Sequence, residues 1–154
     1  MSNHDPHDAM RLAIDASRAA LADGDEPFGA TLVATDGRVL MVAGNRQHSE
    51  RDCTAHAEMV LVRRAQAELG AAALRGATLY ASGEPCAMCA GALFWAGVNQ
   101  IVFAAAQPDL IAALGGPQLP ARCTEVLSAA QPGVAVTGGL LAADALTIVK
   151  EARA

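Results

Sequence analysis

The sequence predicts an α/β fold, a three-layer α/β/α sandwich around a mixed five-stranded sheet. Three observations predict it. Short apolar segments alternate with helical patterns along the chain, one neighbouring pair of them is separated by a hairpin signal, and the others are separated by helices. A hairpin joins antiparallel strands and a helical crossover joins parallel ones. With 154 residues, 53% of them hydrophobic, the chain is expected to form a single domain over residues 1–154.

The first part of the chain is expected to contain a helix, a hairpin and a polar loop. Apolar residues recur at helical spacing over residues 5–22, where Asp5 can act as N-cap and Pro6 suits the first turn. Segments 30–34 and 39–43 read as strands, and the Asp36-Gly37 pair between them favours a hairpin. Residues 45–52 are expected to form a polar loop.

The central part is expected to form a helix, a strand and a second helix. Thr54 is a good N-cap for a helix over residues 55–68, which is rich in strong helix formers. Residues 77–81 have the character of a short buried strand. Pro85 suits the first position of the next helix, which Gly97 would end.

The last third of the chain is expected to complete the sheet. Strands are predicted at residues 100–104 and 134–137, and helices at 108–114, 122–129 and 141–152. Because helical segments separate the fourth and fifth strands, a parallel pairing of these two strands is plausible.

A metal site is predicted where the two central helices begin. His56 lies near the start of the first helix, and Cys86 and Cys89, three residues apart, face the same way on the second. One imidazole and two thiolates are a ligand set that suits zinc. Three protein ligands leave one position of a tetrahedral ion open, which is typical of a catalytic site.

The carboxylate of Glu58 lies two residues after this histidine. A zinc ion makes water a nucleophile at neutral pH, and a neighbouring carboxylate can pass the proton to a ring nitrogen and then to an amine. The predicted chemistry is hydrolytic loss of ammonia from an amidine-like carbon. The alternative is a structural site in which Cys53 is a fourth ligand, but this alternative gives Glu58 no role.

Charge and composition restrict the substrate and the compartment. The net charge is −5, Lys150 is the only lysine and the ten arginines are scattered, which argues against a polynucleotide and favours a small neutral substrate. No segment reads as a membrane span, and the polar start does not resemble a signal peptide. Four cysteines, two of them assigned to metal, favour a reducing cytoplasm.

Several motifs, in order along the chain, resemble those of the cytidine deaminase superfamily of zinc-dependent nucleobase and nucleoside deaminases. They are Pro27-Phe28-Gly29-Ala30, Gly44-Asn45, Thr54-Ala55-His56-Ala57-Glu58, Glu84-Pro85-Cys86-Ala87-Met88-Cys89-Ala90-Gly91-Ala92 and Ile101-Val102-Phe103. The chain is most similar to the branch of guanine deaminases, tRNA adenosine deaminases and fungal-type cytosine deaminases. Residues 91–96 and Asp109 resemble guanine deaminases, whereas residues 134–144 look more like the tRNA-editing enzymes. Cys53 replaces the proline that usually precedes the histidine motif.

The resemblance implies a role for each matching residue. His56, Cys86 and Cys89 would bind zinc, and Glu58 would shuttle protons. The substrate would be contacted by Asn45, the Ala57 amide, Phe28, Trp95 and Asp109.

The function expected from this resemblance is deamination of a free nucleobase, with guanine giving xanthine and ammonia. The alternatives are deamination of cytosine or another amino-heterocycle, deamination of adenosine in tRNA, or a zinc-folded module without activity. A small nucleobase is the expected partner, with nucleic acid unfavoured, and the family suggests a homodimer.

Overall fold

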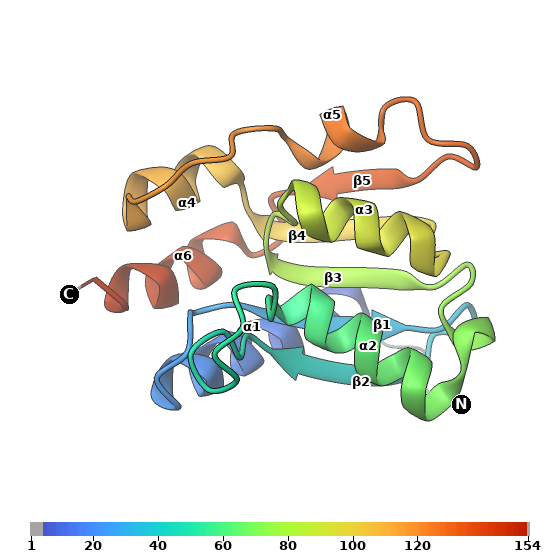
Figure 1. The fold of residues 1–154 in the computed structure, drawn as a ribbon, viewed down its shortest axis with the longest axis horizontal. Coiled ribbons are helices and arrows are strands. Elements are labelled where there is room, and N and C mark those ends of the chain that lie inside the picture. Colours follow the sequence, from blue (N-terminus) through green and yellow to red (C-terminus); the bar gives the residue numbers. More distant parts are fainter. Residues whose placement is uncertain (1–4, 154) are drawn as a thin grey trace.

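The structure is a computed structural model that describes residues 5–153, and its centre is a five-stranded sheet (Figure 1). The polar start of the chain, residues 1–4, lies outside the described part. The strands lie in the order β2-β1-β3-β4-β5. Their bounds are β1 (Gly29–Val33), β2 (Val39–Gly44), β3 (Thr78–Gly83), β4 (Gln100–Ala105) and β5 (Ala135–Gly138).

The sheet is mixed, as predicted. The hairpin partners β1 and β2 are antiparallel, and β1 also pairs antiparallel with β3. The pairs β3–β4 and β4–β5 are parallel, and a helix lies within each connection between them. The parallel arrangement brings the carboxyl ends of β3 and β4 to the same edge of the sheet.

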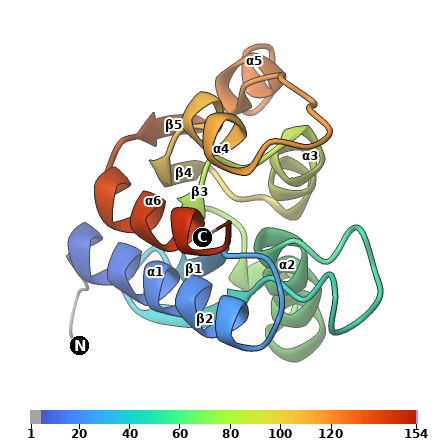
Figure 2. The ribbon, with the colours of Figure 1, turned by 90° about the vertical axis from the view of Figure 1, so that its left-hand side faces the viewer.

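Helices cover both faces of the sheet and complete the predicted three layers (Figure 2). One face packs against α1 (Pro6–Ala22) and α6 (Ala142–Glu151), and the other against α2 (Ala57–Leu69), α3 (Ala87–Ala96) and α5 (Cys123–Leu127). The helix α4 (Gln107–Leu114) follows β4, and a short 3-10 turn occupies Ala71–Ala73. The α/β/α prediction is therefore confirmed. Within residues 5–153, no helix combines the length and the hydrophobicity that crossing a membrane requires.

Both central helices begin two residues later than predicted. The N-cap of α2 is His56, not Thr54, because the backbone N and Oγ1 of Thr54 both donate to Asp52 Oδ1 and hold Thr54 in the preceding turn. The N-cap of α3 is Cys86, and Pro85 lies outside the helix. Neither cap residue bonds the first turn through its side chain. Both side chains are thus available for another purpose.

Candidate active site

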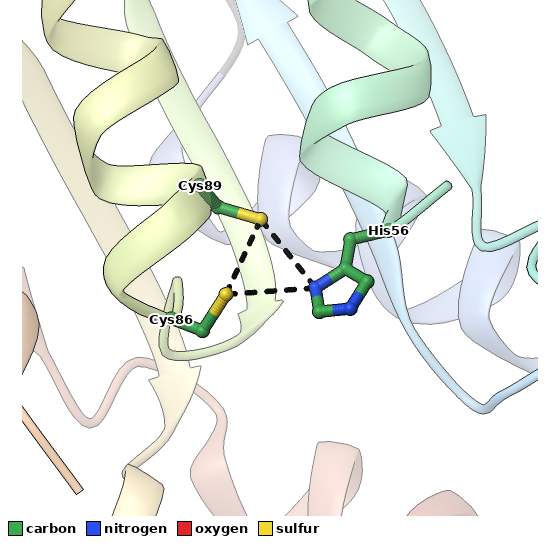
Figure 3. Close-up of side chains that lie close together, drawn as sticks. All are labelled: His56, Cys86 and Cys89. Carbon is green, nitrogen blue, oxygen red and sulfur yellow. Dashed lines mark hydrogen bonds between the residues drawn. The ribbon is translucent and has the colours of Figure 1, made fainter. Parts of the chain in front are cut away.

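The side chains of His56, Cys86 and Cys89 converge where α2 and α3 begin (Figure 3). His56 Nδ1 lies 3.6 Å from Cys86 Sγ and 3.5 Å from Cys89 Sγ, and the two sulfurs are 3.7 Å apart. His56 and Cys86 are 30 positions apart in sequence. The strand β3, which lies between α2 and α3 in the chain, returns the chain so that the two helix starts meet.

These separations match the edges of a zinc tetrahedron. With zinc bonds of about 2.3 Å to sulfur and about 2.0–2.1 Å to nitrogen, tetrahedral geometry separates two sulfurs by about 3.8 Å and a sulfur from a nitrogen by about 3.6 Å. The donor set and its spacing therefore fit a single zinc ion. Cys53 is exposed and does not belong to the group, so the geometry does not support the four-ligand structural alternative.

The closeness of the sulfurs also perturbs their protonation in the metal-free protein. The contact with Cys89 lowers the pKa of the Cys86 thiol to about 4, burial acts against it and His56 adds to the lowering. The pKa of Cys89 is raised, first by Cys86 and then by burial. Two thiolates this close repel each other, so one proton remains on the pair; a divalent cation removes this conflict.

Glu58 lies in the first turn of α2 and is 6% exposed. Burial raises the pKa of its carboxyl to about 7, and the Glu58 backbone amide and His56 act in the opposite direction. A carboxyl group with a pKa near the working pH can both accept and release a proton.

A cavity of about 150 Å³ opens beside the ligand group and is lined by His56, Glu58 and Cys86 among others. Cavities of about this volume accommodate a single aromatic ring such as benzene. Gly83 forms part of the wall. A Cβ atom at this position would lie 2.8 Å from the Phe28 ring, so a larger residue would crowd that ring. The site is thus suited to one small planar ligand.

The structure brings most of the predicted residues together. Phe28 and Asn45 line the cavity with Glu58. Ala57 is buried at the first position of α2, next to His56. The N–H groups in the first turn of a helix have no partner within it, so the Ala57 amide is available at this end of α2.

Trp95 and Asp109 do not line this cavity. Trp95 is 83% exposed and lies about 200° around α3 from the buried Leu93, facing away from the sheet. Asp109 lies in a separate depression with Leu146 and Lys150, toward α6. Neither residue is among those that line the cavity beside the metal group, so their contacts with a substrate stay predictions.

Residues not predicted from the sequence complete the wall. Gln107 and Leu110, three positions apart on α4, face the cavity, and Asp109 between them faces elsewhere. Gln107 Nε2 donates to Leu119 O, and Gln107 Oε1 is buried with no hydrogen-bond donor among residues 5–153. The helical spacing 107/110 is the sequence signal that would have identified this face.

Two further cavity residues, Glu84 and Gln47, were not among the predicted site residues. Glu84 directly precedes Pro85-Cys86, and its carboxylate accepts from the backbone N of Gln107 and of Cys123 at 2.8 and 2.9 Å. Gln47 lies in the predicted polar loop two residues after Asn45. The sequence motifs assigned no function to Glu84 or to Gln47.

Comparison with known proteins identifies relatives of this chain. Residues 3–105 match the family model "Cytidine and deoxycytidylate deaminase zinc-binding region". A probable cytosine deaminase of Schizosaccharomyces pombe is 34% identical over 144 residues, which are 89% of this chain and 85% of that protein. A tRNA-specific adenosine deaminase of Agrobacterium fabrum is 42% identical over 99 residues, or 64% of each chain. A tRNA(Ile)-lysidine synthase of Deinococcus deserti is 38% identical over 93% of this chain.

Similar solved structures include a guanine deaminase from Nitrosomonas europaea. Its TM-score is 0.81 at 29% identity, covering 96% of this chain and 84% of that one. The protein NE0047 in complex with 2,6-diaminopurine has a TM-score of 0.83 at 31% identity, covering 96% and 81%. The chain spans 26% of the lysidine synthase and 64% of the Agrobacterium deaminase, less than two thirds in both cases.

Proposed function

The chain belongs to the cytidine and deoxycytidylate deaminase family, and we propose that it is a zinc-dependent aminohydrolase that deaminates a free nucleobase, with guanine as the preferred substrate. The observation that carries this proposal is the position of the three ligand atoms at the edge of a ring-sized cavity that also contains the buried Glu58. Guanine would give xanthine and ammonia.

We assign the metal to His56, Cys86 and Cys89. When bound there, zinc supplies the Lewis acidity that makes water a nucleophile at neutral pH. Water adds to the amine-bearing carbon of the base, the carbon–nitrogen bond breaks, and the carbon retains the oxygen as a carbonyl group.

Glu58 would move the protons. It takes one proton from the attacking water and gives it to a ring nitrogen; a second proton then reaches the amine, which leaves as ammonia. Because Glu58 lies within α2 and is buried, its carboxyl group is already positioned for each proton transfer.

The cavity wall would orient the base. Phe28, the residue before β1, and Leu110 of α4 border the space, and apolar walls of this kind hold a planar ring. Asn45 would contact a polar edge of the base. The volume of about 150 Å³ favours a free base over a larger nucleoside substrate.

Guanine is placed first because the Nitrosomonas guanine deaminase shares the fold over nearly the whole chain. Cytosine is the next candidate, since the fission-yeast relative is a probable cytosine deaminase. Adenosine in tRNA is third: the Agrobacterium relative supports it, but the net charge of −5 and the scattered arginines weigh against binding a polynucleotide.

The test is ammonia release by the zinc-loaded protein from guanine, cytosine, adenine, their nucleosides and a tRNA. We expect guanine to give the highest kcat/KM. Turnover of tRNA alone would contradict the free-base proposal, and turnover of cytosine alone would retain the chemistry but replace the substrate.

We also propose a homodimer that covers the aromatic pair Phe94 and Trp95 on α3, of which Trp95 is exposed and Phe94 is partly buried. The rings of Phe94 and Trp95 are 5.0 Å apart in an edge-to-face contact, and they border a depression that Val126 completes. Burial of a large aromatic side chain is a strong contribution to association. Sedimentation equilibrium should give twice the chain mass, and a monomer at micromolar concentration would contradict this proposal.

A further inference from the structure

The side-chain amide of Gln47 is held in one orientation by Asn45. Asn45 Nδ2 donates to Gln47 Oε1 at 2.6 Å, and Asn45 Oδ1 accepts from the backbone N of Gln47 at 2.9 Å. Asn45 is 2% exposed, so the group that holds Gln47 is itself buried at the end of β2.

The orientation of both amides is fixed by backbone donors. Asn45 Oδ1 accepts from the N–H groups of Glu26 and Gln47, which can only donate, so the oxygen of Asn45 must face them. Asn45 Nδ2 therefore faces Gln47, and only the oxygen of Gln47 can accept from it. An exchanged assignment of O and N in either side chain would place two donors against each other.

The loop that carries Gln47 is also fixed from a second side. The Asp25 carboxylate is 3% exposed and accepts from the backbone N of His48 at 3.0 Å and of Ser49 at 2.8 Å. These two residues directly follow Gln47. The backbone on both sides of Gln47 is thus held by a buried side chain, and little conformational freedom remains to be lost when a ligand binds.

One half of the Gln47 amide is left unused. Gln47 lines the cavity beside Phe28 and Glu58, and its Nε2 donates to no protein acceptor within residues 5–153. Since Oε1 is held by Asn45, the two N–H bonds of Nε2 are the part of the amide available to a ligand.

We propose that Gln47 determines substrate specificity by donating a hydrogen bond to a carbonyl oxygen of the base, and that Asn45 is the residue that positions it. This inference rests on the proposed function and deepens it. For guanine, the acceptor is the 6-oxo group. The site would select bases that carry a carbonyl group on the edge facing Gln47 over bases that lack one.

The first test compares guanine with 2-aminopurine, which carries the same 2-amino group and has no 6-oxo group. Gln47→Glu keeps an acceptor for Asn45 Nδ2 and removes both donors. We expect kcat/KM for guanine to fall on the order of a hundredfold, and kcat/KM for 2-aminopurine to change by less than about threefold. Gln66→Glu, on the exposed face of α2, is the matched control and should change neither. An equal loss for both bases, or no loss for guanine, would overturn the role of Gln47.

The second test measures binding, so that it remains informative if the protein does not deaminate guanine. Hypoxanthine and purine differ by the 6-oxo group, and neither has an amino group to lose. We expect calorimetry to show tighter binding of hypoxanthine to the wild type, and Gln47→Glu to abolish this difference.

The two tests separate the two proposals. If guanine is not deaminated but the hypoxanthine preference is present and depends on Gln47, the proposed function fails and the role of Gln47 stands. Equal binding of hypoxanthine and purine to the wild type, or binding of neither, overturns the role of Gln47 whatever the activity.

Discussion

Nε of Arg122 donates to both oxygens of the Glu84 carboxylate at 2.9 Å, across 38 positions of sequence. The Glu84 side chain is 1% exposed and that of Arg122 is 39% exposed. The pair fixes the start of α5 to the turn that carries Cys86, one of the three residues that we assign to the metal. With the backbone hydrogen bonds from Gln107 in α4 and Cys123 in α5, it holds three segments together around one buried carboxylate.

Removing this charge should change both stability and its pH dependence. Burial raises the pKa of Glu84, but the hydrogen bonds from Arg122, Gln107 and Cys123 outweigh it and hold the pKa below its ordinary value. The stabilisation is therefore present above the unfolded-state pKa of about 4.3 and is lost as the pH falls through the lower folded-state value. We expect Glu84→Gln to lower the free energy of unfolding by about 1–3 kcal/mol at pH 7.

Urea unfolding with a chelator present, between about pH 7 and pH 3, measures this effect without zinc release. The wild type should lose stability toward pH 3 more steeply than Glu84→Gln. Arg18→Ala, which breaks the exposed pair with Glu151, is the control and should cost less than about 1 kcal/mol. Parallel curves for wild type and Glu84→Gln would contradict the assignment.

Replacement of Glu58 should separate metal binding from turnover. Glu58→Ala is expected to retain one zinc ion per chain and to lose about 10²- to 10⁴-fold in kcat, because general acid–base transfer is lost while the ligands remain. Zinc is measured by atomic emission and kcat by ammonia release. Glu68→Ala, on the exposed end of the same helix, should keep both. A Glu58→Ala protein with near-normal turnover would refute the proton-transfer role.

The cysteines should differ sharply in their effect on metal content. Cys86→Ser removes a thiolate ligand, so we expect the purified protein to lose its zinc and its activity. Cys53→Ser changes an exposed thiol outside the ligand group and should keep both. Zinc loss from Cys53→Ser would instead support the four-ligand structural site.

The sequence predicted the fold and the metal group because their signals are local. Alternating strand and helix patterns determine the layers, and the ligand types and spacing of His56, Cys86 and Cys89 define the site. The predicted start of α2 was wrong by two residues because Thr54 donates to Asp52 instead of capping the helix, a competition that helix propensity does not describe.

The cavity wall was harder to predict because it depends on tertiary contacts. Asp109 was the predicted substrate contact on α4, but the orientation of that helix turns Gln107 and Leu110 toward the cavity. The bond between Glu84 and Arg122 joins residues with no shared motif. Trp95 was assigned to the pocket from a resemblance, and the helical rotation from Leu93 places it on the surface of this chain.

The wall at Gly83 allows a final test of the cavity. A Cβ atom at this position would lie 2.8 Å from Phe28 Cε1 and 3.0 Å from Leu110 Cδ1, both of which border the ligand space. We expect Gly83→Ala to push these side chains into the cavity and to raise KM for the nucleobase at least about tenfold, while zinc content is retained. Gly133→Ala, where a Cβ atom would meet nothing within 4 Å, should leave KM unchanged. Because the ligands themselves are not altered, an unchanged KM in a folded, zinc-loaded Gly83→Ala protein would mean that the substrate binds outside the space between Phe28 and Leu110.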